Sequence, residues 1–158
     1  MLRLFVAQLD PLMEVDDSLF VLLGDLGYRL FNDLREKFPN RCINIGASER
    51  LMIGAAAGMT TLGKIPICYS ITPFLLYRPF EFIRNYLQEE GLAVKLVGSG
   101  RDKDYKDAGY THHSVEAESI LNQLPNIEKF FPQDEQQLTL QMNSFIYSKN
   151  PGFMSLRK

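Results

Sequence analysis

Short apolar runs alternate with longer amphipathic segments along this chain of 158 residues, and this alternation is what most limits its fold. Apolar runs bounded by glycine or polar residues are typical of strands buried in a parallel sheet, and segments with helical periodicity cover such a sheet. The sequence therefore predicts an α/β fold, a three-layer α/β/α arrangement around a mostly parallel sheet of about six strands. The expected strands are 19–23, 41–45, 65–69, 92–97, 127–131 and 153–156, and the expected helices are 28–37, 48–61, 78–88, 114–121 and 134–148.

Length and composition indicate one domain over residues 1–158, although residues 1–16 have no assigned place in it and form either a helix or an arm around a neighbour. The net charge of -2 gives no reason to expect nucleic acid or an acidic membrane as a partner. Asp10 and Pro11 interrupt the N-terminus too early for a signal peptide, and no apolar run approaches the ~18 residues of a membrane span. We therefore expect a cytoplasmic protein.

The two cysteines, Cys42 and Cys68, both lie in expected strands. We expect buried free thiols in a reducing compartment, with a disulfide or a metal pair as the alternative. No cluster of cysteine and histidine has the spacing of a zinc site, so no metal ligand is assigned.

Polar and aromatic residues follow several of the expected strands. Ligands of open parallel sheets bind beyond the carboxyl ends of the strands, and these ends meet at one edge. We therefore expect Asp25, Glu49, Phe74, His112 and His113 to converge there. The pattern alone predicts a ligand site without defining its chemistry.

Each of these residues also has a purely structural interpretation. Glu49 begins an expected helix, where the helix dipole favours an acid. Phe74 and Tyr77 are of types that usually fill a core, and His112 and His113 lie in a loop where solvation is usual. Only a wider pattern separates these interpretations from functional ones.

Such a pattern begins at Asn44. The run NIGASERLMIGAAAG, residues 44–58, resembles the N-[IV]-G-[IA]-x-E-x-x-M-x-x-x-A-A-G signature of the pyrimidine-binding domain of transketolase-like enzymes. The resemblance continues in the family's order over residues 18–158, and it implies the thiamine-diphosphate-binding fold. The further matching pieces are Asp25-Leu26-Gly27, Gly63–Pro66, Ser70–Arg78, Ala108–His112, Pro125–Ile127 and Asn150–Arg157.

The resemblance implies roles for several residues in holding the cofactor. Glu49 matches the glutamate that hydrogen-bonds a pyrimidine nitrogen of thiamine diphosphate and thereby activates the cofactor. Phe74 matches the aromatic residue that stacks on the pyrimidine, Tyr77 a neighbouring wall, and Asp25 an acid of the cofactor site. Glu49 must be buried for this role, because the carboxyl shares a proton with a weakly basic ring.

The resemblance also implies how a small-molecule substrate is bound. His112 matches the family's catalytic histidine that contacts substrate oxygens, and His113 stands beside it, where the family often has glutamine. Arg157 matches an arginine that can bind the phosphate of a sugar phosphate. Ala108 stands where the family often has an acid, and either Ile71 or Thr72 stands where it often has an aromatic residue, so ordinary pentose phosphates are in doubt as substrates.

The family's diphosphate and Mg²⁺ are held by a separate domain with a Gly-Asp-Gly…Asn signature, and this sequence contains no Gly-Asp-Gly. The family's third domain is also expected to be absent. We therefore expect a split enzyme, in which a diphosphate-binding transketolase-like subunit holds the Mg²⁺ and pairs with this chain as a hetero-oligomer, such as α2β2.

Three functions are consistent with the sequence. The first is a subunit of a thiamine-dependent transketolase that transfers a ketol unit between sugar-like or sugar-phosphate-like substrates. The second is a subunit of a thiamine-dependent decarboxylase or synthase that acts on 2-keto acids. The third is a non-catalytic protein on the same fold, for which Ala108 and Ile71 would be signs of drift.

Overall fold

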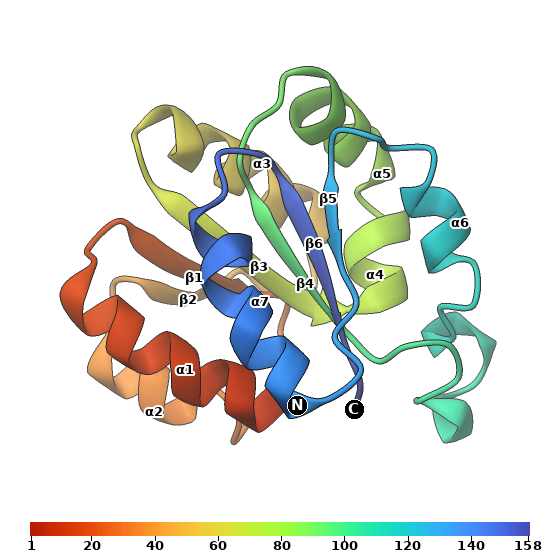
Figure 1. Ribbon diagram of the computed structural model, residues 1–158, viewed down its shortest axis with the longest axis horizontal. Coiled ribbons are helices and arrows are strands. Elements are labelled where there is room, and N and C mark those ends of the chain that lie inside the picture. Colours follow the sequence, from red (N-terminus) through yellow and green to blue (C-terminus); the bar gives the residue numbers. More distant parts are fainter.

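The computed structural model describes residues 1–158 and contains a six-stranded sheet in which every neighbouring pair of strands is parallel. The strand order is β2-β1-β3-β4-β6-β5 (Figure 1). This confirms the predicted α/β fold. The strands are β1 (Leu19–Leu23), β2 (Cys42–Asn44), β3 (Ile65–Ile71), β4 (Lys95–Ser99), β5 (Glu128–Phe130) and β6 (Gly152–Leu156).

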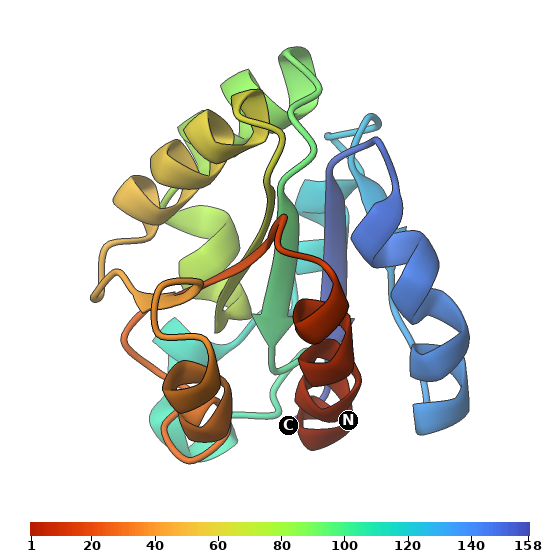
Figure 2. The ribbon, with the colours of Figure 1, turned by 90° about the vertical axis from the view of Figure 1, so that its left-hand side faces the viewer.

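Helices cover both faces of the sheet, so the core has two halves. Side chains alternate along the strands, so that Val21 and Leu23 join one half while Leu22 joins the other. Helices α1 and α7 pack on the first face, and α3 lies on the opposite face (Figure 2). The helices are α1 (Leu2–Val15), α2 (Asn32–Lys37), α3 (Glu49–Thr61), α4 (Thr72–Tyr77), α5 (Phe80–Phe82), α6 (Ala117–Leu121) and α7 (Glu135–Tyr147).

Residues 1–16, which the sequence left unplaced, consist mainly of α1. Its residues Phe5, Leu9 and Met13 recur every four positions and are buried in the first half of the core. Gln8 on its outer side donates a hydrogen bond of 2.6 Å to the hydroxyl of Thr139 in α7. The N-terminal segment is therefore a layer of the fold and not an arm around a neighbour.

The segment 72–90 differs most from the predicted elements. A helix was expected over 78–88, but the chain forms α4, then α5, then a π-helical turn over Ile83–Glu89. Pro73 suits the first turn of α4, where its missing N–H needs no partner. Pro79 is the N-cap of α5 and separates the two helices. Pro79 therefore explains the break between α4 and α5.

Both cysteines are buried and free, as the sequence predicts. Burial raises the pKa of both thiols, and that of Cys42 reaches about 11. Both thiols therefore stay protonated at neutral pH. None of the helices combines the length and apolar character that crossing a membrane requires.

Lys95 is a charged residue inside the fold, at the start of β4. Its side chain is buried and its Nζ donates hydrogen bonds to the carbonyl oxygens of Ser148, at 2.8 Å, and Asn150, at 2.5 Å. These carbonyls follow the C-terminus of α7, where a cation is favourable. Lys95 therefore ties the end of α7 to the sheet.

Candidate functional site

The candidate site lies at the carboxyl edge of the sheet, where three strands place their ends side by side. The register pairs Leu23 of β1 with Asn44 of β2 and with Tyr69 of β3. Beyond β2 the chain turns and enters α3 at Glu49, and beyond β3 it enters α4 directly. Residues that follow β1, β2 and β3 are therefore neighbours in space although they are distant in sequence.

Glu49 lies at the centre of this edge and is only 3% exposed. The hydroxyl of Ser70, at the end of β3, donates to its Oε1 at 3.3 Å. A side chain at Gly24 would crowd the same space, because a Cβ atom there would lie 3.1 Å from Ser70 Oγ and 3.7 Å from Glu49 Oε1. Ser48 occupies the N-cap position but makes no capping hydrogen bond through its side chain. The carboxylate is thus held at the positive end of α3 in a space kept open by a glycine.

Arg78 is the second partner of this carboxylate. Its Nη1 donates to both Oε1 and Oε2 of Glu49, at 3.1 Å each. The guanidinium carbon also lies 3.8 Å from the centre of the Phe74 ring, and the ring of His112 meets Phe74 edge-on at 4.9 Å between centroids. We call Glu49, Ser70, Phe74, Arg78 and His112 the Glu49 cluster. The structure therefore brings together three of the residues predicted from the sequence: Glu49, Phe74 and His112.

Tyr77 and His113 lie beside this cluster, around a cavity of about 290 Å³ that Phe74 also lines. The hydroxyl of Tyr77 donates to Glu116 at 3.4 Å, and burial together with that carboxylate raises the pKa of Tyr77 to about 12. The Nε2 atom of His113 is buried and has no hydrogen-bond partner. Tyr77 and Phe74 therefore line the same cavity. The lining consists of Pro73, Phe74, Tyr77, Arg78, Tyr110, Thr111, His113 and Glu116.

Asp25 has partners outside the Glu49 cluster. Its carboxylate accepts hydrogen bonds from Asn44, at 2.9 Å, and from the hydroxyl of Tyr28, at 2.7 Å, and these bonds lower the pKa of Asp25. Its backbone is left-handed, with φ of 55°. Asp25 therefore links the turn after β1 to the end of β2.

Arg157 is at the end of β6 and is paired with two acids. Its Nη1 lies 3.1 Å from Asp104, and its Nη2 lies 3.6 Å from Asp102. The neighbouring Arg101 is buried, and its Nη2 donates to the carbonyl oxygens of Ser155 and Pro132. Burial and the charge of Arg157 lower the pKa of Arg101. Arg157 is accessible to a ligand, whereas the guanidinium of Arg101 is buried and occupied by hydrogen bonds within the fold.

The sequence predicted no role for Ser70 or Arg78. A usable signal existed for Arg78, because residues four apart on a helical segment share a face and Phe74 precedes it by four. Ser70 carried no such signal, because an end-of-strand serine gives no indication of which acid it will meet. Both residues surround the carboxylate that the sequence singled out.

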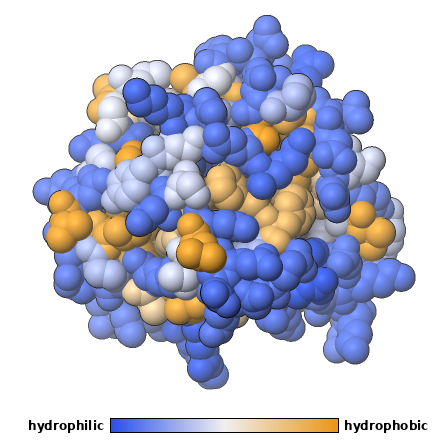
Figure 3. Space-filling view, in the orientation of Figure 1, coloured by the Kyte–Doolittle hydropathy of each residue, from blue (hydrophilic) through white to orange (hydrophobic).

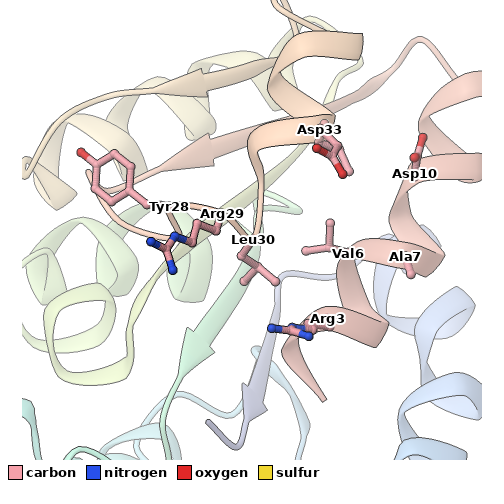
Figure 4. Close-up of a pocket in the computed structure, with 9 residues that line it drawn as sticks. Arg3, Val6, Ala7, Asp10, Tyr28, Arg29, Leu30 and Asp33 are labelled. Carbon is pink, nitrogen blue, oxygen red and sulfur yellow. The ribbon is translucent and has the colours of Figure 1, made fainter.

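A larger hollow of about 550 Å³ lies elsewhere, between α1 and the segment that follows β1. Figure 4 shows Arg3 and Arg29 on either side of Leu30, with Asp10 and Asp33 further along. The two arginines and two aspartates balance in charge, so the hollow has no net charge to select an ion. None of the residues predicted as site residues lines it.

The fold and the site define a class of protein: an open parallel α/β sheet with a buried carboxylate, an aromatic ring and a histidine gathered at its carboxyl edge, where such folds bind ligands. The chain belongs to the family described as transketolase, pyrimidine binding domain, which matches residues 3–158. The match includes α1, so the N-terminal helix belongs to the matched region.

Characterised relatives agree with this assignment. The chain is 32% identical over 144 residues to the 6-deoxy-6-sulfo-D-fructose transketolase subunit SqwH of Clostridium sp. (strain MSTE9), covering 90% of this chain and 45% of that protein. It is 32% identical over 102 residues to the 1-deoxy-D-xylulose-5-phosphate synthase of Bacillus cytotoxicus, covering 65% of this chain and 16% of that enzyme. The chain spans less than half the length of these relatives.

A solved structure is also similar over nearly the whole chain. A split gene transketolase, described as an inactive beta4 tetramer, superimposes with a TM-score of 0.85 at 28% sequence identity. The alignment covers 98% of this chain and 50% of that one. This similarity confirms the predicted arrangement of the sheet and its helices.

Proposed function

We propose that this chain binds the aminopyrimidine ring of thiamine diphosphate and forms the pyrimidine-binding part of a transketolase-like transferase. The enzyme would move a ketol unit between sugar-like or sugar-phosphate-like substrates. The observation that carries the proposal is the buried carboxylate of Glu49 at the carboxyl edge of the sheet, with the ring of Phe74 beside its partner Arg78. A carboxyl and an aromatic face at one site are what a flat, weakly basic ring requires.

The residues around Glu49 fit a ring of this kind. A side chain at Gly24 would crowd the hydroxyl of Ser70, which would lie 3.1 Å from its Cβ atom, and would touch the carboxylate of Glu49. Ser70 is itself fully buried and fixes Oε1 from the protein side. A carboxylate held in this way makes strong hydrogen bonds, since water is excluded and the local dielectric constant is low.

Thiamine diphosphate, when bound, supplies an electron sink for breaking and forming a bond next to a carbonyl carbon. Glu49 holds a proton at the junction between its carboxylate and the ring nitrogen, which is the role proposed for it in activation. Phe74 orients the ring by stacking, and Tyr77 closes the neighbouring wall.

Substrate contacts are proposed for the residues around the loop 101–113. The ring of His112 packs edge-on against Phe74, so its imidazole lies next to the proposed ring site and can hydrogen-bond substrate oxygens. His113 lines the adjacent cavity with an unpaired Nε2. Arg157 is the candidate for a phosphate group, which would compete for it with Asp102 and Asp104.

We propose that the diphosphate and its Mg²⁺ are held by residues of another chain. No group of three or more His, Cys, Asp or Glu side chains in this chain is arranged to hold a metal ion. We therefore assign the diphosphate and Mg²⁺ to a diphosphate-binding transketolase-like subunit, with α2β2 as the expected assembly. Asp25, at the turn after β1, is retained as a cofactor-site residue on the strength of the resemblance alone.

The test is reconstitution with a diphosphate-binding chain that carries the Gly-Asp-Gly…Asn signature, to be sought first among the genes that neighbour this one. Ketol transfer is measured with thiamine diphosphate and Mg²⁺ for the natural sequence, Glu49→Gln, and the control Glu36→Gln on the exposed side of α2. We expect Glu49→Gln to lower kcat by roughly 100-fold or more, since it removes the proton-holding group. Turnover that is the same in both variants would remove Glu49 from the mechanism.

A second candidate function is a thiamine-dependent synthase or decarboxylase that acts on a 2-keto acid. The similarity to a 1-deoxy-D-xylulose-5-phosphate synthase favours it, although that match covers 65% of this chain compared with 90% for the transketolase subunit. A panel of ketoses and 2-keto acids offered to the assembled enzyme separates the two candidates.

A further inference from the structure

The carboxylate of Glu49 has one hydrogen-bond partner that reaches solvent. Its two hydrogen-bond partners are Ser70 and Arg78. Ser70 is fully buried, whereas the side chain of Arg78 is 49% exposed and that of Glu49 only 2%. A ligand that comes from solvent to bond this carboxylate therefore meets the guanidinium first.

The contacts of Arg78 are the same two that a pyrimidine ring would need. Its guanidinium is flat, donates N–H groups to both oxygens of Glu49 at 3.1 Å, and lies 3.8 Å from the centre of the Phe74 ring. An aminopyrimidine bound between Glu49 and Phe74 would also be flat, would donate to the carboxylate, and would stack on that ring. The two groups would therefore compete for one place.

We propose that Arg78 is an internal ligand of the pyrimidine site. Its guanidinium holds the place of the aminopyrimidine ring when the cofactor is absent, and the ring binds fully only when this side chain swings outward. The inference rests on the proposed function, because it presupposes that the ring binds between Glu49 and Phe74. It adds a residue that sets the affinity of the site for the ring.

The position of Arg78 allows the movement. Arg78 follows the last residue of α4 and its long side chain is half-exposed. Its polar contacts are confined to Glu49, so leaving the site breaks one ion pair and one stacking contact. The guanidinium regains water when it leaves, and the ring takes over its hydrogen bond to the carboxylate, so we expect displacement to cost roughly ten-fold or less in affinity.

The ion pair between Arg78 and Glu49 also stabilises the site when no cofactor is bound. A buried carboxylate without a partner is strongly destabilising, so a chain that waits for its cofactor needs a substitute cation. Arg78 provides that charge and can leave because it remains in contact with solvent. Ser70 cannot do so, since it is neutral and enclosed.

The test uses the whole chain labelled with ¹⁵N and a probe that carries only the ring, 4-amino-5-hydroxymethyl-2-methylpyrimidine. Its Kd is measured by chemical-shift titration for the natural sequence and for four variants: Arg78→Met, Arg78→Gln, Arg84→Met and Glu49→Gln. Arg84 is a matched control, because it is an exposed arginine nearby whose hydrogen-bond partner is Asn85. We expect Arg78→Met and Arg78→Gln to bind the probe about five-fold more tightly, and Arg84→Met to match the natural sequence.

The outcomes separate the inference from the function on which it rests. Equal or weaker probe binding in both Arg78 variants, with binding still lost in Glu49→Gln, overturns the role of Arg78 and leaves the pyrimidine site in place. An absence of probe-induced shifts at Glu49 and Phe74 in every variant contradicts both. Arg78→Gln guards against a fold defect in Arg78→Met, and dispersed amide spectra show whether each variant is folded.

Discussion

Three buried charged residues, Glu49, Lys95 and Arg101, differ in how their charges are balanced. Lys95 and Arg101 donate to backbone carbonyls, which are fixed parts of the fold. Glu49 instead faces a half-exposed guanidinium, that of Arg78. A partner that reaches solvent can be exchanged for a ligand, and fixed carbonyls cannot. Glu49 is therefore the buried charge best suited to binding.

Lys95 gives a prediction about pH. Burial lowers the pKa of Lys95 from 10.5 to about 8, so between these values the unfolded chain binds more protons than the folded chain. The contribution of this group to stability is present above the unfolded value and is lost as pH falls toward 8. We expect the natural sequence to gain stability relative to Lys95→Met between pH 8 and 10.5, by at most about 1.4 kcal/mol per unit of pKa shift.

Urea unfolding of both proteins across this range measures the difference directly. The carbonyl oxygens of Ser148 and Asn150 favour the charged amine, so the gain should fall short of that limit. A difference in unfolding free energy that does not change with pH would show that Lys95 keeps its ordinary titration.

At the level of residues, the sequence identified Glu49, Phe74 and His112 correctly as neighbours, because strand ends in a parallel sheet meet at one edge. It could not give the partner of Arg157, because the loop that holds Asp102 and Asp104 has no periodicity that fixes its path. Loop contacts of this kind depend on the final packing.

Strand β4 ends two residues later than predicted, and the reason is a glycine. The sequence ended the strand before Gly98, because glycine usually marks a turn, but β4 continues to Ser99. In the structure, a Cβ atom at Gly98 would lie 2.6 Å from Thr72 Oγ1 and 2.8 Å from Phe153 Cζ. Glycine is needed there for close packing between β4, α4 and β6.

Gly98→Ala should therefore destabilise the fold by about 1–3 kcal/mol, as overpacking of a close-packed core does. Gly58→Ala is the matched control, because a Cβ atom there meets nothing within 4 Å and Gly58 lies inside α3. We expect the control to gain up to about 1 kcal/mol from helix propensity. Thermal unfolding of the two variants should show melting temperatures that move in opposite directions, and similar melting temperatures would contradict this account.

Helix α3 shows how precisely helical periodicity predicts the buried face of a helix. Helical periodicity alone predicts a packing face made of Leu51, Met52, Ala55, Ala56 and Met59. In the structure Leu51 is 59% exposed, and the buried apolar positions are Met52, Ile53, Ala56 and Ala57. An apolar residue on either side of the true stripe satisfies helical periodicity almost equally well. The buried face of α3 was therefore predicted to within one residue. Packing against the sheet determines which of the two neighbouring rows of apolar residues is buried.

At the scale of the whole molecule, the alternation of strands and helices predicted the layers, whereas the place of α1 depended on a helix far along the chain. Phe5, Leu9 and Met13 had the right spacing, but what they pack against includes α7, which starts at Glu135. The surface over α1 and α7 is mostly hydrophilic with scattered apolar patches (Figure 3). This face therefore resembles an ordinary solvent-facing surface.

The proposed partner, and not this chain, is assigned the Mg²⁺, and this assignment gives a prediction about metal binding. Because the chain has no cluster of metal ligands, removing divalent ions with EDTA should leave the melting temperature of the isolated chain unchanged. The assembled enzyme, by contrast, should lose activity and recover it with Mg²⁺. A Mg²⁺-dependent shift in the melting temperature of the isolated chain would place a metal site here and contradict the proposed division.

The role proposed for Glu49 is to activate thiamine diphosphate, and proton exchange at the cofactor measures this activation before any substrate is involved. The quantity is the rate at which the thiazolium C2 proton exchanges with D₂O in the assembled enzyme, followed by acid quench and NMR, for the natural sequence, Glu49→Gln and the control Glu36→Gln. We predict a fall of roughly 100-fold or more in Glu49→Gln and no change in the control. Equal exchange rates in all three proteins would contradict the claim.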